Sequence, residues 1–350
     1  MKVYHQIPEI KLESQHPYIS YNMFKLWEKT NVTSIESGWE PLYFVENDSF
    51  SYAYKKSHSY GEFIFDWAWA DLYHRYQIPY YPKLLHALPV TPISAPKIIN
   101  PSDAFIKSLI KYYLDNDFSG HHILFTHEDS RFIQQGYFYQ KTLQFHFINR
   151  FETYEDYLSA LKARKRKNIL KERKIVEYYP IKIIKKESSQ ISLSERKEIY
   201  LLYLSTIMKK YSQAYLTENF FLSLESGFYY LAYQNQELIA MSLFFEGEKK
   251  LYGRYWGIRP EFENQYSYLH FEMCYYLAIE YVIENRYLVF EAGAQGEQKL
   301  LRGFTPVEIG SLHHIKQPQF RVAIENHVKN QNLLIEKEIE TLKSYLPYKK

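Results

Sequence analysis

The chain has 350 residues, 46% of them hydrophobic, so it can form one large domain or two ordinary ones, and global disorder is excluded. The formal net charge of +3 excludes the strongly basic surface typical of many nucleic-acid-binding proteins. The single cysteine, Cys274, excludes an intramolecular disulfide and a cysteine-rich zinc site. The first thirty residues contain no apolar leader, and no run reaches the ~18 apolar residues of a membrane-spanning helix. We therefore expect a soluble cytoplasmic protein.

The first half of the chain predicts alternating helices and strands. Helical segments are expected at 18–30, 66–76 and 102–116. Ser102 or Asp103 can cap the third of these helices. Strands are expected at 41–46, 49–57 and 121–127, and residues 137–149 alternate like an exposed edge strand. Residues 83–99 are expected to be extended and are interrupted by prolines.

The second half gives a clearer order of elements. It predicts a long basic helix at 153–179, a helix at 194–212, three antiparallel strands within 228–258, a helix at 266–286 and a strand at 287–293. Thr153 and Asp156 have the spacing of a capping box at the start of the basic helix. This order resembles the core of the GNAT acyltransferases, and the first half has a weaker version of it. We predict an α/β (α+β) fold with two tandem GNAT-like halves, mixed and mostly antiparallel sheets flanked by helices, and domains at 1–149 and 150–350.

The basic helix carries a block of like charges. Residues 163–174 contain seven Lys or Arg and one Glu. On a helix Arg164 and Lys167 share one face, and Arg166 flanks it. A solvated surface is one interpretation, but such blocks usually have a partner. We therefore favour binding of phosphates, from RNA or from a nucleotide sugar.

An aromatic segment at 55–71 contains a second group of polar residues. His58 with Glu62 could be a base and the group that orients it, with Asp66 nearby. The same residues could form a structural network in the core, and spacing alone favours that interpretation. Gly61 and the serines predict a loop rather than a metal-binding helix motif, so no metal is implied.

Further polar residues follow the three-strand meander. The sequence "GRYWG" places Arg254 and Trp256 at a strand end, and "LHFE" places His270 and Glu272 in the first turns of the next helix. An imidazole near a helix N-terminus suits either a base or a neutral hydrogen-bonding group. Cys274 has apolar neighbours and is interpreted as a packing residue.

The segment "EAGAQGEQKLLRGF" (291–304) is rich in glycine. It lacks the GK[ST] ending of a phosphate-binding P-loop, and no long helix follows it as in a dinucleotide-binding motif. The G-x-S-x-G motif of serine hydrolases is also absent. The segment is therefore interpreted as a turn that presents Glu297, Lys299 and Arg302.

Several of these blocks together resemble the FemAB-like GNAT proteins, which are labelled peptidoglycan biosynthesis or recognition proteins. They include "KSHSYGEFIFDWAWADLYHR", "LKARKRKNILKERK", "LYGRYWG", "LHFEMCYY" and "FEAGAQGEQKLLRGF", and the resemblance covers residues 14–328. It implies two GNAT-like halves, as in the aminoacyltransferases that extend peptidoglycan bridges from aminoacyl-tRNA. The family pattern has Glu-His-Lys in the last block, whereas Gln298 follows Glu297 here. Glutamine keeps the hydrogen bonding but does not titrate.

A second departure concerns the acyl donor. GNAT enzymes that use acetyl-CoA have a glycine-rich loop for the pyrophosphate after the last meander strand. Residues 258–268 contain no glycine and include acidic side chains. The donor is therefore expected to be aminoacyl-tRNA rather than acyl-CoA, and no other cofactor is expected.

The sequence thus predicts an acyltransferase that moves an aminoacyl or acyl group to an amine, such as one on a peptidoglycan precursor. The expected catalytic residues are Glu272, His270, Glu297 and Lys299. The expected substrate-binding residues are Arg254, Trp256, Arg302, His58, Asp66, Arg164, Arg166 and Lys167. The alternatives are a non-catalytic GNAT-fold protein that binds cell-wall or RNA ligands, and an acetyl-CoA-dependent N-acetyltransferase. A catalytic site should bring Glu272, Lys299 and Arg302 into one cleft, whereas a binding protein could use them in separate ion pairs.

Overall fold

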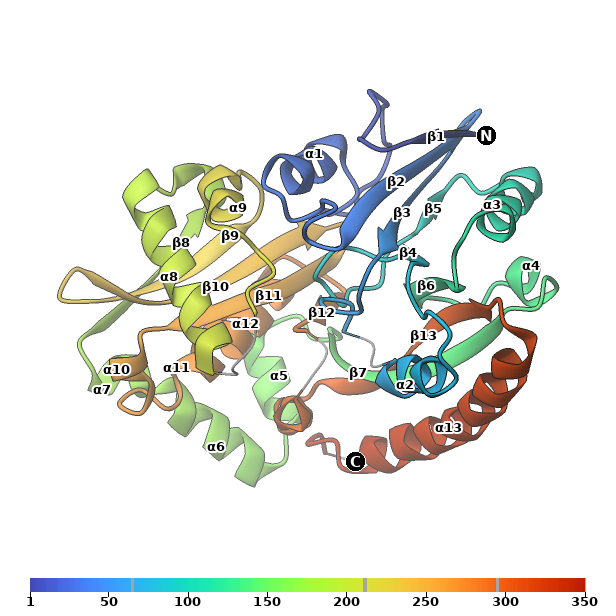
Figure 1. The fold of residues 1–350 in the computed structure, drawn as a ribbon. Helices are drawn as coiled ribbons and strands as arrows, with labels where there is room; N and C mark the ends of the chain where they lie inside the picture. Colours follow the sequence, from blue (N-terminus) through green and yellow to red (C-terminus); the bar gives the residue numbers. More distant parts are fainter. Residues whose placement is uncertain (64–65, 210–212, 294–295, 350) are drawn as a thin grey trace. The chain divides into compact units, whose positions relative to one another are not determined.

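The structure is a computed structural model that describes residues 1–63, 66–209, 213–293 and 296–349. The chain forms two compact units, each drawn from three segments (Figure 1). Unit 1 comprises Met1–Leu12, Tyr21–Leu143 and Glu308–Glu340. Unit 2 comprises Glu13–Ser20, Gln144–Val307 and Thr341–Lys350. The predicted domains at 1–149 and 150–350 stay a prediction.

Unit 1 is built on a mixed sheet. Its strands, in spatial order, are β1 (Lys2–Tyr4), β2 (Trp39–Glu46), β3 (Ser49–Lys56), β4 (Lys83–His86), β6 (Gly120–Thr126), β13 (Thr305–Ile315) and β7 (Phe138–Ile148), and β5 (Ile98–Ile99) pairs with β3. All pairs from β1 to β4 are antiparallel, β4 and β6 are parallel, and β6 and β13 are antiparallel. The helices are α1 (Tyr21–Lys29), α2 (Trp67–Arg75), α3 (Asp103–Asp115), α4 (Ser130–Ile133) and α13 (Pro318–Ser344).

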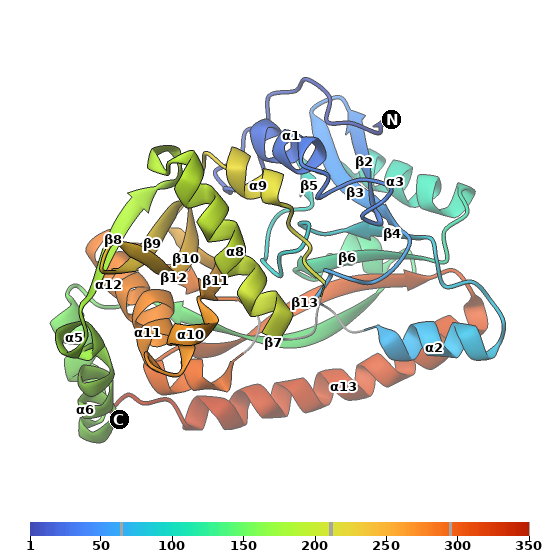
Figure 2. The ribbon, with the colours of Figure 1, turned by 60° about the vertical axis from the view of Figure 1, so that its left-hand side comes forward.

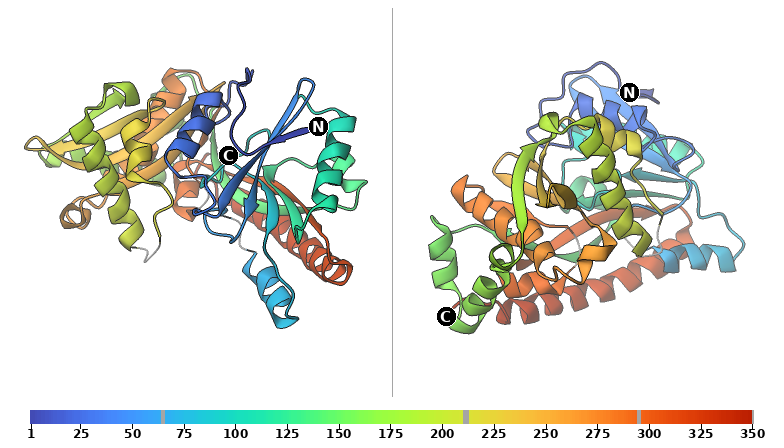
Figure 3. Two further views of the ribbon diagram at one scale, coloured as in Figure 1. Left: turned by 45° about the horizontal axis from the view of Figure 1, so that its top comes forward. Right: turned by 90° about the vertical axis from the view of Figure 1, so that its left-hand side faces the viewer.

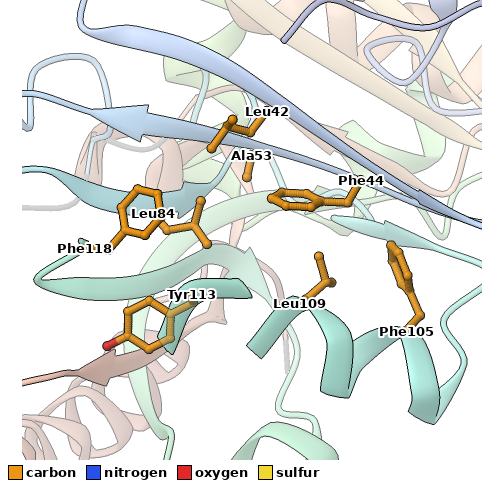
Figure 4. Close-up of a cluster of buried hydrophobic side chains, with 8 residues drawn as sticks. All are labelled: Leu42, Phe44, Ala53, Leu84, Phe105, Leu109, Tyr113 and Phe118. Atoms are coloured by element: carbon orange, nitrogen blue, oxygen red, sulfur yellow. The ribbon is translucent and has the colours of Figure 1, made fainter. Parts of the chain in front are cut away.

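An apolar core fills the space between this sheet and α3. Ser102 caps α3 by accepting a hydrogen bond from the Phe105 backbone N–H, as its position predicts. Figure 4 shows the cluster that results, which contains Leu42, Phe44, Ala53, Leu84, Phe105, Leu109, Tyr113 and Phe118. A second cluster joins α2 and α13 to β7 and β13 through Trp69, Tyr73, Tyr80, Phe138, Ile315, Phe320, Ile324 and Val328. Burial of these side chains is the main favourable term in folding.

Unit 2 is built on a second run of strands. In spatial order these are β7, β12 (Val289–Glu291), β11 (Lys250–Ile258), β10 (Glu237–Gly247), β9 (Phe228–Gln234) and β8 (Ile181–Glu187). Strands β8 to β11 form an antiparallel meander, and β11 and β12 are parallel. The meander strands lie between α8 (Leu193–Lys209) and α12 (Leu277–Glu284) (Figures 2 and 3).

Short helices complete unit 2. These are α5 (Tyr154–Ala160), α6 (Ala163–Arg173), α7 (Ile175–Tyr178), α9 (Glu218–Ser223), α10 (Pro260–Glu263) and α11 (Leu269–Phe271), with 3-10 helices η1 (Ser188–Gln190) and η3 (Glu297–Arg302) and the π-helix η2 (Glu272–Tyr276). The predicted fold class is confirmed: helices flank mixed, mostly antiparallel strands. The three meander strands and the Thr153–Asp156 capping box are also confirmed.

Two predictions about individual elements are wrong. The single helix at 153–179 is divided into α5, α6 and α7. The break between α5 and α6 occurs at Leu161, which has extended backbone angles and forms a β-bridge with Tyr348. The strand at 137–149 is not an edge strand, since β7 has β13 on one side and β12 on the other. Within the described residues, no helix combines the length and the apolar character needed to cross a membrane.

Candidate active site

Strand β11 contains a bulge where the "GRYWG" motif ends the meander. Ser242 of β10 pairs with Trp256, whereas Phe244 pairs with Gly253. Two steps along β10 therefore correspond to three along β11, and the extra residue lies between Gly253 and Trp256. A bulge bends its strand and redirects side chains. Arg254 and Tyr255 lie within the bulge, where the regular alternation of the sheet is interrupted.

Strand β12 accompanies β11 only over its first residues. Lys250–Tyr252 pair with Val289–Glu291, where β12 ends, so this edge of β11 has no paired strand beyond Tyr252 in the described part of the chain. Hydroxyl groups of α8 bind carbonyl groups of the second half of β11. Ser205 donates to the Ile258 oxygen at 2.7 Å, and Thr206 donates to the Trp256 oxygen at 2.9 Å. The end of β11 is thus held by α8 rather than by a neighbouring strand at this edge.

A cavity of about 1310 Å³ lies beside this end of β11. Side chains from α8, α10 and α11, the helices labelled in Figure 2, contribute to its wall. The lining includes Leu201, Leu204, Met208, Trp256, Ile258, Tyr266, His270, Phe271, Tyr275 and Gln298. A smaller cavity of about 80 Å³ shares Trp256, His270 and Tyr275 with it and also contacts Arg254 and Cys274. The structure therefore brings together Arg254, Trp256 and His270, three of the residues that the sequence patterns single out.

His270 lies between the aromatic side chains of this wall. Its ring centroid is 5.2 Å from that of Trp256 and 5.3 Å from that of Tyr275. It belongs to α11, directly before the π-helix η2. π-Helical turns are rare and are often found at functional sites, because the extra residue changes which side chains share a face. The imidazole is therefore positioned by an irregular backbone and lines both cavities.

Lys299 does not line the smaller cavity but lies near Arg254 and Cys274, which do. Its side chain is 1% exposed, and its Nζ atom donates a hydrogen bond of 2.6 Å to the Gly293 carbonyl oxygen. Burial and the neighbouring Arg254 guanidinium lower the pKa of Lys299 to about 7. Burial also raises the pKa of the Cys274 thiol, so the cysteine is a protonated, packed side chain. Two basic groups, Lys299 and Arg254, thus converge beside the turn at Gly293.

Glu272 points to a different partner. Its carboxylate accepts hydrogen bonds from the Arg173 guanidinium at 3.0 to 3.2 Å, and Arg173 also contacts Glu280 at 2.7 Å. Burial raises the pKa of Glu272, while Arg173 opposes the shift. The carboxylate therefore connects η2 to α6, and this ion pair accounts for its position without a catalytic role.

Arg302 is also held in a structural contact. Its guanidinium donates to Glu172 at 2.6 Å and to the Gln298 carbonyl oxygen at 2.9 Å, and it lies 3.6 Å from the centre of the Phe271 ring. Glu172 also accepts a hydrogen bond from Tyr276. Arg302 therefore connects η3 to α6. Glu272, Lys299 and Arg302 each have their own set of polar partners, which is the arrangement expected of separate structural contacts.

The remaining residues of the glycine-rich segment lie near the larger cavity. Gly296 and Gln298 line it, and the Gln298 side chain hydrogen-bonds to Tyr275. Glu297 is exposed at the start of η3. Gln298 thus contributes an amide to the cavity wall. Ala294 and Gln295 lie outside the described residues.

The two predicted residues of unit 1 have different environments. His58 is half-buried against Gly38, and its Nδ1 atom accepts a hydrogen bond from the Tyr60 backbone N–H. Burial and the nearby Lys56 lower the pKa of His58. Asp66 is buried and belongs to a network that does not include the His58 ring. Neither residue lines the cavities beside β11.

The network around Asp66 is centred on Lys83, which is not among the residues predicted from the sequence. The Lys83 ammonium lies 2.5 Å from Asp66, 2.8 Å from Glu62 and 2.8 Å from the Ser59 hydroxyl. Burial would raise the pKa of Asp66, but Lys83 and three hydrogen bonds hold it below its ordinary value. A charged residue at the start of the apolar strand "KLLH" was the available signal. The network fixes the loop after β3 onto the sheet.

The predicted anion-binding residues lie on α6. Arg164 and Lys167 are exposed, and Arg166 is half-buried. None of these three forms an ion pair with another described residue. Among the described residues, no group of three or more His, Cys, Asp or Glu side chains could hold a metal ion.

Comparisons with solved structures reveal the same fold at low sequence identity. The structure of L-PGS from Bacillus licheniformis matches with a TM-score of 0.54 and 10% identity, over 94% of this chain and 99% of that one. FemX matches with a TM-score of 0.53 and 10% identity, over 86% of this chain and 93% of that one. A conserved protein of unknown function from Bacteroides thetaiotaomicron matches with a TM-score of 0.53 and 8% identity, over 86% of this chain and 91% of that one. No curated protein matches the sequence.

The sequence itself matches one protein family over nearly its whole length. The match covers residues 4–350, and the family is described as peptidoglycan biosynthesis/recognition. It includes β11, α11 and η3, which carry Arg254, His270 and Lys299. The chain therefore belongs to the FemAB-like family.

Proposed function

We propose that this protein is an acyltransferase that moves an aminoacyl or acyl group from an ester or thioester donor to an amine, with a peptidoglycan precursor as the acceptor. The observation that carries the proposal is the convergence of Arg254, His270 and Lys299 at the bulged, partly unpaired end of β11. His270 lines the large cavity, and the smaller cavity beside it is lined by both His270 and Arg254. Family membership and the fold shared with FemX support the same activity class.

The residues suggest how the transfer would proceed. The neutral amine attacks the carbonyl carbon of the donor, and the tetrahedral intermediate then expels the donor oxygen or sulfur. His270, which lines both cavities, accepts the proton that the amine loses. Arg254 is placed to balance negative charge on the carbonyl oxygen, with Lys299 behind it. Backbone N–H groups near the bulge would assist as an oxyanion site. The protein's main contribution is to hold the two reactants together, so no nucleophilic side chain is required.

The cavity wall favours a donor other than acyl-CoA. Among the described residues, Lys209 is the one Lys or Arg that lines the larger cavity, and it forms an ion pair with Glu263. A pyrophosphate group would need unpaired donors or a helix N-terminus free of carboxylates. The first turn of α10 instead carries Glu261 and Glu263. These features support aminoacyl-tRNA as the donor. Gln298 would then hydrogen-bond to the acyl group of the donor or to the peptide of the acceptor.

The test is a search for the product. Purified protein is incubated with extract fractions that contain charged tRNA and cell-wall precursors, and the mixture is compared by mass spectrometry with one that contains His270→Gln. A new amide that requires His270 supports the proposal. Thermal unfolding with acetyl-CoA and with aminoacyl-tRNA identifies the donor, because a ligand that binds the folded state raises the melting temperature. Stabilisation by acetyl-CoA alone would exclude the tRNA donor.

A binding protein without catalysis is the second candidate. It is favoured by the separate ion pairs of Glu272 with Arg173 and of Arg302 with Glu172. In that case a cell-wall peptide would stabilise the protein, yet no amide product would form with any donor. Equal product formation by wild type and His270→Gln would remove His270 from the mechanism.

A further inference from the structure

The surface formed by α6 and α7 has a character that acyl transfer does not explain. We define the α6–α7 surface by its cations and by its exposed apolar side chains. The cations are Arg164, Lys165, Arg166, Lys167, Lys171 and Lys174. The apolar and aromatic side chains are Leu170, Tyr178 and Leu301, which are 44%, 71% and 45% exposed. Leu301 belongs to this surface because it lines a small depression together with Lys165 and Asn168 of α6.

The inward face of α6 is fixed. Ile169 is buried, Arg173 pairs with Glu272 and Glu280, and Glu172 pairs with Arg302. Glu172 is the only carboxylate of α6, and because it pairs with Arg302 it does not neutralise the cations of the outward face. The helix cannot rotate without breaking buried ion pairs, which is costly. The outward face is therefore presented to solvent as a fixed feature.

The outward face combines positive charge with apolar area. Four of the six cations, Arg164, Lys167, Lys171 and Lys174, are exposed, whereas Lys165 and Arg166 are half-buried. None of the six forms an ion pair with another described residue, and Glu177 is the one exposed carboxylate within 162–179. Lys167 and Lys174 lie three residues before and four residues after Leu170, so the leucine is flanked by cations along the helix. Lys349 extends the charge at the start of α6, because its backbone N–H donates to the Ala160 carbonyl oxygen. Clustered like charges repel one another and usually have an anionic partner.

We propose that the α6–α7 surface binds the anionic surface of a lipid bilayer. Cations attract the headgroups, and the apolar side chains enter the boundary between headgroups and acyl chains. Tyr178 suits the boundary between headgroups and acyl chains because its ring is apolar and its hydroxyl is polar. A nucleic acid would use the cations equally well, but its phosphates and sugars give no reason to expose the aliphatic Leu170 and Leu301. The apolar residues therefore favour a bilayer over RNA. Figure 1 shows α6 at the periphery of unit 2.

The test measures binding to vesicles with the whole chain. Wild type should sediment with vesicles of phosphatidylglycerol and phosphatidylcholine but not with phosphatidylcholine alone, and high salt should weaken the binding. The variant Lys167→Glu with Lys171→Glu should bind roughly tenfold more weakly or worse. The matched control, Lys107→Glu with Lys197→Glu, makes the same charge change at exposed sites on α3 and α8 and should bind nearly as wild type does.

A second variant separates a bilayer from RNA. Leu170→Ser keeps every charge, so it should weaken vesicle binding severalfold and leave any binding of bulk tRNA unchanged. Both variants change exposed side chains, and thermal unfolding checks that each is folded. The proposal is overturned if wild type binds tRNA but not the anionic vesicles at the same salt, or if the control variant loses as much vesicle binding as the α6 variant. The readout needs neither donor nor acceptor, so it does not depend on the proposed transferase activity.

Discussion

The Nζ atom of Lys299 donates a 2.6 Å hydrogen bond to the carbonyl oxygen of Gly293. Gly293 has a φ of +82°, a conformation that glycine adopts without strain. The turn after β12 is therefore held by a buried amine that is itself beside a second basic group, Arg254. This contact closes the glycine-rich segment on itself beside Arg254 of β11, and it gives Lys299 a structural role in addition to any electrostatic one.

The buried amine predicts a pH dependence of stability. The pKa of Lys299 is about 7 in the folded protein and has its higher ordinary value in the unfolded chain. Between these values the unfolded state binds more protons, so raising the pH stabilises the folded state. In Lys299→Met this contribution is absent. The stability of wild type relative to Lys299→Met should therefore increase from neutral pH toward pH ~10.

Urea unfolding of both proteins at several pH values measures this difference. Lys56 also has a pKa of about 7 because of burial, but it is present in both proteins and cancels. Lys197→Met, at an exposed position on α8, is the matched control and should give a difference that does not vary with pH. A constant difference for Lys299→Met as well would mean that Lys299 keeps an ordinary pKa.

The contrast between local and distant contacts determines how much of this fold could be predicted. The Thr153–Asp156 capping box and the three-strand meander depend on neighbours in sequence, and both are confirmed. The break after α5 was missed because it depends on a β-bridge between Leu161 and Tyr348 at the end of the chain. Periodicity is a local property, and a bridge between distant residues leaves no trace in it.

The same contrast between local and distant contacts applies to the candidate site. Arg254, Trp256 and His270 could be selected because each lies at the end of a predicted strand or the start of a predicted helix. The partner of Glu272 is Arg173, 99 residues away, so its ion pair could not be anticipated from spacing. The Lys83 network was missed for the same reason, since its two carboxylates lie in the loop after β3, 21 and 17 residues before Lys83, and no sequence pattern indicates that pairing.

His270→Gln should separate catalysis from stability. The imidazole lines both cavities, and glutamine keeps a hydrogen-bonding group there but cannot accept the proton. We expect the rate of transfer to fall about 100-fold or more, with a melting temperature close to that of wild type. Cys274→Ser, in the wall of the same small cavity, is the matched control and should keep most of the activity. A rate that is unchanged in His270→Gln would show that another group takes the proton.

Lys83→Met should strongly destabilise unit 1. The change leaves Glu62 and Asp66 buried without their shared cation. Breaking a buried ion pair on one side typically costs about 3–5 kcal/mol. Urea unfolding measures the loss, and Arg75→Met serves as the control, because its exposed pair with Asp71 should contribute less than about 1 kcal/mol. Equal effects of the two substitutions would mean that water compensates the charges around Lys83.

The Asp66 carboxylate predicts acid sensitivity of the same network. Its pKa is held below the ordinary value, so it stabilises the folded state at neutral pH. This contribution is lost as the pH falls from the unfolded pKa through the lower folded pKa. The difference in stability between wild type and Asp66→Asn should therefore shrink as the solution is acidified toward that range. Denaturant unfolding from neutral to acid pH measures it, and a difference that grows on acidification would contradict the assignment.

Arg302→Gln tests whether this residue binds substrate or supports the fold. The guanidinium pairs with Glu172 and stacks on Phe271, so its loss leaves a half-buried carboxylate with one fewer donor and removes a cation–π contact. We expect the melting temperature to fall clearly, while KM for both substrates stays close to wild type in the folded protein. Arg302→Lys should restore little stability. The lysine ammonium is not planar, so it cannot donate to Glu172 and the Gln298 carbonyl oxygen in the same geometry or stack on the Phe271 ring as a guanidinium does. A raised KM with an unchanged melting temperature would instead assign Arg302 to the substrate, as the sequence pattern alone predicts.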